Sequence, residues 1–294
     1  MSVKLTRAAM TATEKYLFDL QGFLVVKGVL SPAEVAAANA AIDTRAAAGG
    51  FCERTGAVLR NTKATSGAMM TGDGTTGRLD MGGMLGWPGA DSAVFRSVLA
   101  HPRLVPYFET LLGQGYRMDH MPLLIASEKG CDGFSLHGGT VDEAGNYNPG
   151  LAYTYSHGRM HNPLLACSVQ LCDHGAGDGG FVCVPGSHKA NFPTPPELME
   201  GRDTMGCLVQ PVTEAGDVVL FSEGTVHGAA AWTAEHQRRV SDRVVCVCVC
   251  VCACEDGGGG WGGGGSGEDA MHVSTAGTAL QRSPLPPHPY PYSF

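Results

Sequence analysis

Hydrophobic residues in the second half of the chain come in short runs that are separated by turn residues. Glycine-rich and proline-containing turns stand between several of the runs, for example GAGDGG at 175–180 and PGS at 185–187. This pattern is typical of an antiparallel sandwich or barrel. The predicted strands cover residues 116–120, 122–126, 151–155, 164–172, 180–184, 207–211, 217–221 and 226–231. Such a series of short strands fits a double-stranded β-helix, the jelly-roll or cupin-like barrel, whose interior can hold a small ligand.

The first part of the chain shows helical spacing instead. After a β-branched strand at 22–26, the motif SPAE at 31–34 provides an N-cap, a first-turn proline and a capping-box glutamate. These residues predict a helix that extends to about residue 45. Two further short helices are predicted at 91–99 and 102–112, where apolar residues recur at helical spacing.

Residues 49–90 lack a clear period. They are rich in Gly, Thr and Met, which predicts a long loop over the surface or over an active site. The chain is therefore predicted to be mainly β with a helical N-terminal part. Helical support is expected over about 1–113 and jelly-roll strands over about 114–239.

The character of the sequence changes abruptly after Arg239. A run of VVCVCVCVCAC is followed by a glycine-rich stretch and then by a proline-rich end. A GT dinucleotide repeat encodes alternating Val and Cys, and the codons GTGAGT, the usual start of an intron, can encode Val240 and Ser241. We therefore interpret residues 240–294 as a low-complexity tail produced by translation into an unspliced intron. A spliced transcript that continues unchanged through codons 240–254 would refute this interpretation.

Two other interpretations of the tail are a genuine disordered segment and a Cys-rich metal-binding tract. Alternate cysteines on a strand point to one face, whereas zinc sites use Cys-x2-Cys pairs at turns, so the metal-binding interpretation is weak. If the domain ends at residue 239, its barrel lacks the last strand or two. We therefore expect an unpaired sheet edge and poor stability for the 294-residue chain.

Charge and composition narrow the range of partners. The formal net charge is −8 and the 20 Lys and Arg residues are scattered, which argues against nucleic acid or an anionic membrane as the main partner. No apolar run approaches the roughly 20 residues needed to cross a bilayer, and the N-terminus lacks the apolar core of a secretory signal. Apart from the alternating run, the cysteines are dispersed, as in proteins with reduced thiols. A soluble, cytoplasmic protein is the expectation.

Three polar features in the strand-rich part carry the candidate chemistry. They are LHGG at 136–139, EGTVHG at 223–228 and the pair Arg238 and Arg239. Two histidines from distant parts of a barrel can converge on one metal, and neutral imidazole suits iron. A planar, permanently charged guanidinium pairs bidentately with a carboxylate. Because side chains alternate along a strand, only one of the two arginines can face the barrel interior.

Four segments are distinctive when they are taken together. They read QGFLVVKGVLSPAEV at 21–35, GDGGFVCVPGSHKANFP at 177–193, EAGDVVLFSEGTVHGAAAW at 214–232 and QRR at 237–239. With these segments the chain resembles the phytanoyl-CoA dioxygenase family over roughly residues 14–239. The resemblance implies a jelly-roll oxygenase that uses iron(II), 2-oxoglutarate and molecular oxygen. Such an enzyme would hydroxylate a small-molecule or lipid-like substrate and release succinate and carbon dioxide.

The resemblance also implies roles for individual residues. His137 would be the proximal iron ligand and His227 the distal one. Arg238, eleven residues beyond His227, matches the family's arginine that grips the far carboxylate of 2-oxoglutarate. Arg239 is the alternative candidate for binding this carboxylate.

The chain departs from the family pattern at the third iron ligand. The family has His-x-Asp, whereas this chain has Gly139 at the position of the aspartate. Three explanations compete. Asp142 or Glu143 reaches the metal from the flexible glycine loop, or water or chloride fills the position, or the site does not hold iron well.

The chloride explanation resembles the iron halogenases, in which Gly or Ala replaces this carboxylate and a halide takes its place. Glycine removes both charge and bulk, so the position becomes open to an anion. A vacancy permits halide binding without requiring it, and halogenation therefore ranks below hydroxylation. A catalytically inactive jelly-roll binding protein is the third interpretation of the chain.

Two further residues have expected structural roles. His188, in the motif PGSHK, is expected at a turn or beside the cosubstrate and not on the metal. Trp232 is expected to pack at the barrel mouth.

Overall fold

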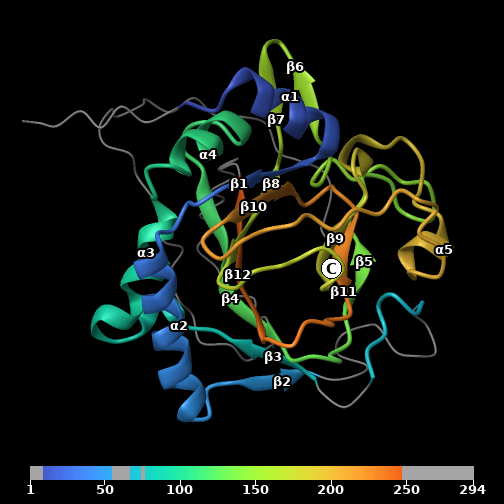
Figure 1. Ribbon diagram of the computed structural model, residues 1–294. Coiled ribbons are helices and arrows are strands. Elements are labelled where there is room, and N and C mark those ends of the chain that lie inside the picture. The colour runs from blue at the N-terminus through green and yellow to red at the C-terminus, as the bar shows by residue number, and fades with distance from the viewer. Residues whose placement is uncertain (1–8, 55–66, 74–76, 247–294) are drawn as a thin grey trace, which may run out of the picture.

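Two antiparallel β-sheets form the barrel of this protein. The computed structural model describes residues 9–54, 67–73 and 77–246. The larger sheet has the strand order β1 (Phe23–Val26), β10 (Val218–Ser222), β8 (Leu164–Gln170), β12 (Arg238–Cys246), β4 (Arg117–Ser127), β3 (Arg78–Met81) and β2 (Cys52–Arg54). The smaller sheet has the order β5 (Phe134–His137), β11 (His227–Ala230) and β9 (Gly180–Cys183). Figure 1 shows β9, β5 and β11 grouped across the barrel from β12 and β4. The predicted mainly β architecture with a helical N-terminal part is confirmed.

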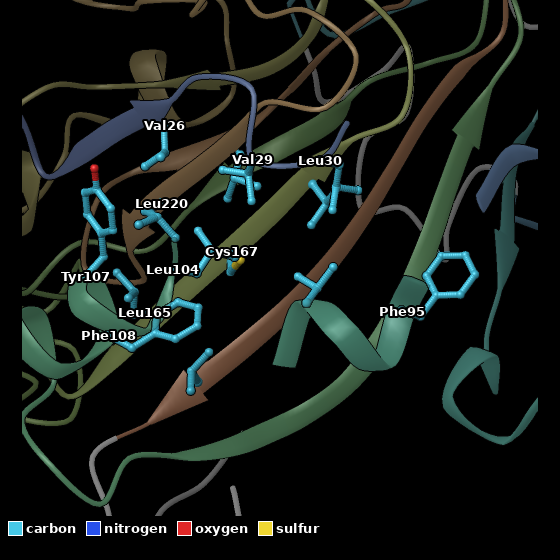
Figure 2. Packing of buried hydrophobic residues seen from close by; sticks show 14 of the residues in the cluster. Val26, Val29, Leu30, Phe95, Leu104, Tyr107, Phe108, Leu165, Cys167 and Leu220 are labelled. Carbon is cyan, nitrogen blue, oxygen red and sulfur yellow. The ribbon is translucent and has the colours of Figure 1, made fainter. Parts of the chain in front are cut away.

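Helices of the N-terminal part cover the outer face of the larger sheet. They are α1 (Ala12–Gln21), α2 (Pro32–Ala47), α3 (Ala93–Leu99) and α4 (Val105–Leu111), with the short 3-10 helices η2 (Met84–Gly86) and η3 (Gly89–Ser92) before α3. Their buried residues, such as Ile42 and Phe108, join Leu165 and Leu220 of the sheet in one hydrophobic cluster. Figure 2 shows Phe108, Leu165 and Leu220 gathered in this cluster. Among the residues described, no helix is long and apolar enough to cross a membrane.

The remaining elements lie on the connections between strands. They are the hairpin of β6 (Thr154–Ser156) and β7 (Arg159–His161), the turn η4 (Ser187–Lys189) and the short helix α5 (Pro196–Met199).

Side chains of the larger sheet alternate between the helices and the barrel interior. On β8, Leu165 and Cys167 belong to the core beneath the helices, whereas Ala166 lines the interior cavity. On β12, Arg238 and Asp242 line the same cavity. The period of two along each strand therefore assigns one face to the core and the other to the interior.

The start of α2 agrees with the prediction from its capping motif. The Ser31 hydroxyl accepts a hydrogen bond from the Glu34 backbone N–H at 3.3 Å, and the Glu34 carboxylate accepts one from the Ser31 N–H at 2.8 Å. Pro32 occupies the first turn, where its missing N–H is not needed. This reciprocal capping satisfies donors that the helix itself leaves open.

Strand β12 continues past the predicted end of the domain at Arg239. Residues 240–246 pair with β4 on one side and with β8 on the other, and both Val240 and Val245 are buried. The strand has partners on both sides, so the unpaired edge expected after Arg239 does not occur in the described barrel. Three of the seven residues 240–246 are valines, and β-branched residues favour a strand where neighbouring strands are available for pairing.

The sheet therefore extends beyond the predicted boundary of the domain. The intron interpretation concerns the transcript, and it stays a hypothesis. Most of the predicted tail, residues 247–294, lies outside the described residues.

Several other local predictions differ from the structure. Within 49–90, which was expected to be a loop, β2 pairs with β3 and β3 pairs with β4 at the sheet edge. The runs at 116–120 and 122–126 form the single strand β4. The run at 207–211 forms no strand, and only Val209 makes an isolated bridge to Cys183. Short segments of this kind take their structure from the neighbours that pair with them, which a sequence pattern does not record.

Candidate functional site

A cavity of about 330 Å³ lies between the two sheets. Its wall includes residues from β4 and β12 of the larger sheet and from β5, β9 and β11 of the smaller one. All three residues predicted from the sequence, His137, His227 and Arg238, line it. The barrel thus brings together side chains that are about a hundred residues apart in the chain.

The two histidines lie on neighbouring strands of the smaller sheet. His137 on β5 and His227 on β11 are register partners, and their ring centroids are 4.2 Å apart. The His137 Nδ1 bonds to the Ser135 carbonyl at 3.1 Å, and the His227 Nδ1 bonds to the Thr225 carbonyl at 2.7 Å. A carbonyl only accepts, so Nδ1 is the donor in each ring and Nε2 carries the lone pair. Metal-binding histidines are commonly oriented by such a bond from the other ring nitrogen.

The surroundings of the two rings differ. His137 is exposed, whereas His227 is buried, with its ring centroid 4.6 Å from that of Phe221. Burial lowers the pKa of His227 to about 4, and the bond to the Thr225 carbonyl opposes this shift only in part. His227 is therefore neutral near pH 7, which is the form that binds a metal ion.

Arg238 lies in the cavity wall with most of its surface removed from solvent. It is 6% exposed, and its Nε has no hydrogen-bond partner among the residues that the structure describes. A Cβ atom at Gly180 would lie 2.8 Å from this Nε, so only glycine leaves room for the guanidinium there. Burial lowers the pKa of the Arg238 guanidinium, which nevertheless stays cationic. A buried cation with an unused donor is a site for an anionic group.

Strand alternation separates the two candidate arginines. Arg239 points to the other side of the sheet, where its guanidinium donates to Asp43 at 2.7 Å and to Asn39 at 3.1 Å on α2. Arg238 therefore faces the cavity and Arg239 faces α2, as the period of two along a strand requires.

Four more charged residues line the cavity and were not singled out in the sequence. They are Arg78, Asp132, Glu223 and Asp242. Arg78 makes two hydrogen bonds to Asp80, at 2.8 and 2.7 Å. Arg78 belongs to a segment without periodicity, and Asp242 belongs to residues 240–294, which the sequence pattern assigns to a low-complexity tail, so no motif indicates either residue.

Glu223 is the one of these residues that approaches the histidines. Its Oε2 lies 3.9 Å from the His227 Nε2, and its side chain is 20% exposed. Burial raises the pKa of the Glu223 carboxyl, and the nearby His137 acts in the opposite direction. The sequence signal for this contact was its position four residues before His227 in the motif EGTVHG.

The candidates for a third ligand near Gly139 do not reach the cavity. Asp142 is exposed, and its carboxylate accepts hydrogen bonds from the Asn146 backbone N–H at 2.8 Å and side chain at 3.0 Å. Glu143 is also exposed, and neither residue lines the cavity. In the part of the chain that the structure describes, no third His, Cys, Asp or Glu completes a ready-made metal cluster with the two histidines.

His188 and Trp232 take different positions relative to the cavity. His188 is fully buried in η4, beside the rings of Phe18 and Tyr153, and does not line the cavity. Trp232 does line the cavity, and its indole N–H donates to the His236 carbonyl at 2.6 Å. His188 is thus a core residue at a turn, and Trp232 is part of the cavity wall.

Solved structures of other proteins share this fold. HygX from Streptomyces hygroscopicus, solved with nickel and 2-oxoglutarate bound, superposes with a TM-score of 0.63 at 23% identity, covering 82% of this chain and 88% of that chain. The epimerase SnoN from nogalamycin biosynthesis gives a TM-score of 0.54 at 21% identity, covering 79% and 81%. EctD from S. alaskensis gives a TM-score of 0.54 at 20% identity, covering 83% of this chain and 79% of that chain. At these identities the likeness establishes the fold.

The sequence itself establishes the family. Residues 18–240 match the family described as phytanoyl-CoA dioxygenase (PhyH), which is most of the chain and nearly the span of the resemblance noted above. The chain therefore belongs to the phytanoyl-CoA dioxygenase family and is a homologue of the 2-oxoglutarate-dependent oxygenases.

Proposed function

We propose that this chain is an iron(II)- and 2-oxoglutarate-dependent dioxygenase that hydroxylates a small-molecule or lipid-like substrate. The observation that carries the proposal is the content of one cavity. It contains two adjacent imidazoles whose Nε2 atoms carry lone pairs, together with a buried guanidinium whose Nε has no partner. Imidazole nitrogens suit iron, and a guanidinium suits a carboxylate.

The solved relatives support this choice of cofactors. HygX has been solved with iron bound, and separately with nickel and 2-oxoglutarate bound. EctD has been solved with 2-oxoglutarate and 5-hydroxyectoine. The donor set of the present cavity is compatible with the same pair of cofactors.

Each residue of the chain would have a defined part in the reaction. His137 and His227 would hold the iron, and Arg238 would pair with the distal carboxylate of 2-oxoglutarate. Iron with 2-oxoglutarate and oxygen supplies the oxidising chemistry, in which one oxygen atom enters a C–H bond, the other enters succinate, and carbon dioxide leaves. The rings of Phe181 and Phe221 lie beside His227 and exclude water from that side of the site.

The relatives also support a small-molecule substrate. HygX has been solved with hygromycin B bound, and EctD with 5-hydroxyectoine. The present cavity combines apolar walls, such as Leu123 and Ile125, with several charged groups. A ligand with both apolar and polar parts fits such a lining.

The test is the formation of succinate from 2-oxoglutarate by the purified chain. We expect turnover that requires iron and stops in His137→Ala. The side chain missing at Gly139 gives the halogenase alternative its support, since a Cβ built there has no neighbour closer than 3.5 Å. A chlorinated product in the presence of chloride would favour that alternative. No turnover together with no iron uptake would favour a binding protein.

A further inference from the structure

We infer that Glu223 supplies the carboxylate ligand that is missing at Gly139, so that the metal centre of this chain is His137, His227 and Glu223. The inference rests on the proposed function, because it concerns the same iron. It assigns the third ligand to a different strand connection from the one used by the family pattern.

The position of Glu223 follows from the barrel topology. The residue comes directly after β10 of the larger sheet and four residues before His227 on β11 of the smaller one. Its backbone N–H donates to the Leu164 carbonyl at 3.1 Å, which holds the connection against β8. The side chain therefore starts from a fixed backbone and lines the same cavity as both imidazoles, within 4 Å of His227.

Glu223 lies close enough to His227 for a small side-chain movement to make both residues ligands of one ion. The Oε2 and Nε2 atoms are 3.9 Å apart. Nitrogen and oxygen ligands lie about 2.1 Å from a divalent first-row metal, so adjacent ligands are about 3.0 Å apart and the Glu223 oxygen has to move about 1 Å toward His227. The backbone can therefore stay in place, and rotation within the flexible Glu223 side chain completes the arrangement.

The burial of Glu223 also calls for a cationic partner. The side chain is only 20% exposed, and within the described residues no donor makes a hydrogen bond to its carboxylate. A carboxylate removed from water without donors is costly unless a cation is paired with it. A divalent ion held by the two neighbouring imidazoles provides that pairing.

Most other carboxylates near the site have partners or lie elsewhere. Asp242 in the cavity wall is hydrogen-bonded to Ser168 and lies near the Arg238 charge, although its Oδ1 has no partner among the described residues. Asp132 accepts the Gly72 N–H at 2.6 Å, and Asp80 is held by Arg78. Asp142 is bound to Asn146 outside the cavity. Asp119 contacts His120 at 2.8 Å elsewhere in the cavity wall, whereas Glu223 is the described acidic residue that lies within 4 Å of His227.

Glu223 as the third ligand also affects which reaction the site favours. A metal centre with two histidines and one carboxylate has the same ligand types and net charge as the family pattern. The position beside Gly139 is then not needed for a halide, and hydroxylation is favoured over halogenation.

The experiment measures metal binding without turnover. The full 294-residue chain, its Glu223→Gln variant and its His137→Ala variant are titrated anaerobically with Co(II), and the visible absorption spectrum reports the ligand set. We expect both substitutions to weaken Co(II) binding by at least about 100-fold, since even the partners of metal ligands contribute 10–100-fold to affinity. The spectrum of bound Co(II) should also change in Glu223→Gln.

Two control variants separate ligation from charge. Asp142→Asn removes the exposed carboxylate near Gly139, and we expect unchanged affinity. Asp132→Asn removes a negative charge from the same cavity, and we expect a loss below about tenfold with the Co(II) spectrum unchanged. A spectrum that changes equally in Asp132→Asn and Glu223→Gln would overturn the inference.

Folding is followed by the melting temperature without and with Co(II). Glutamine has the shape of glutamate without its charge, so the apo form of Glu223→Gln should melt no lower than the parent chain, while the increase caused by metal should be lost. Glu223→Asp serves as a second variant, and its shorter reach should also weaken binding.

The outcomes distinguish this inference from the proposed function. Wild-type affinity in either Glu223 variant, with affinity lost in His137→Ala, would overturn the role of Glu223 alone. Chloride-dependent Co(II) binding that is insensitive to Glu223→Gln would assign the position to a halide. Unchanged binding in His137→Ala would instead overturn the metal centre of the proposed function.

Discussion

The two faces of the larger sheet are built from the same strands but have opposite characters. The face toward the helices is apolar and closed, with Leu165 and Leu220 fully buried. The face toward the barrel interior carries charged groups such as Arg238 and Asp242 around an open cavity. Neighbouring residues on one strand therefore serve stability and chemistry separately. Substitutions on the two faces should separate these two properties.

Removal of most of β12, which contributes side chains to both faces, should have the largest effect on stability. A chain that ends at Arg239 lacks residues 240–246, which pair with both β4 and β8 at the centre of the sheet. We expect this truncated chain to lose cooperative thermal unfolding, whereas the full chain retains it. Circular dichroism during heating measures the difference, and equal cooperative transitions in both chains would show that β12 is dispensable.

The next largest effect is expected on the KM for 2-oxoglutarate, and it should differ between two neighbouring arginines on opposite faces of the sheet. Arg238→Ala should raise the KM for 2-oxoglutarate by at least about 30-fold, because removing one partner of a buried charge pair costs about 2–5 kcal/mol. Arg239→Ala should leave this KM within about threefold, because Arg239 contacts α2 and its partly exposed ion pair contributes little. Succinate formation at varied 2-oxoglutarate gives both values. A larger effect from Arg239 would reverse the assignment of the two faces.

A comparison of apolar residues tests the helix-facing side. Leu165→Ala should lower the free energy of unfolding by about 2–5 kcal/mol, because a fully buried side chain leaves a cavity when it is shortened. Ile125→Ala should cost less, since that side chain already borders an open cavity. Denaturant unfolding measures both. The KM for 2-oxoglutarate should stay unchanged in folded Leu165→Ala.

Asp217, at the edge of the core, is expected to make a smaller and pH-dependent contribution to the free energy of unfolding. Asp217 accepts hydrogen bonds from Lys27 Nζ at 2.6 Å, the Gly28 N–H at 2.8 Å and the Glu214 N–H at 2.7 Å. Burial would raise the pKa of Asp217, but the bonds from Glu214, Lys27 and Gly28 outweigh it and lower the pKa. This contribution to stability is present above the unfolded pKa, near 3.9, and is lost as the pH falls through the folded value.

Asp217→Asn isolates this contribution. At pH 7 we expect a loss of about 1–3 kcal/mol in the free energy of unfolding, as for hydrogen bonds that involve a charged group. The difference between the parent chain and Asp217→Asn should shrink below about pH 4, because the parent carboxylate is then protonated in part. Denaturant unfolding at several pH values gives the profile. A difference that grows toward acid would contradict the assignment.

Local patterns along the chain determined much of this protein. The capping motif SPAE placed the start of α2, and the alternation of short apolar runs predicted the β-rich half. The motifs around His137 and His227, with the arginine pair after them, identified residues that do line one cavity. These features depend on neighbouring residues, since capping and strand alternation act over a few positions.

Only the tertiary structure decided which distant residues meet. The pairing of β11 with β5 and β9 set the two imidazoles side by side, and the connection after β10 brought Glu223 to them. Pairing with β4 and β8 makes residues 240–246 a central strand of the larger sheet, although composition alone assigns them to a tail. Contacts between strands depend on register and on the partners available, and neither is written in the local pattern of a single segment.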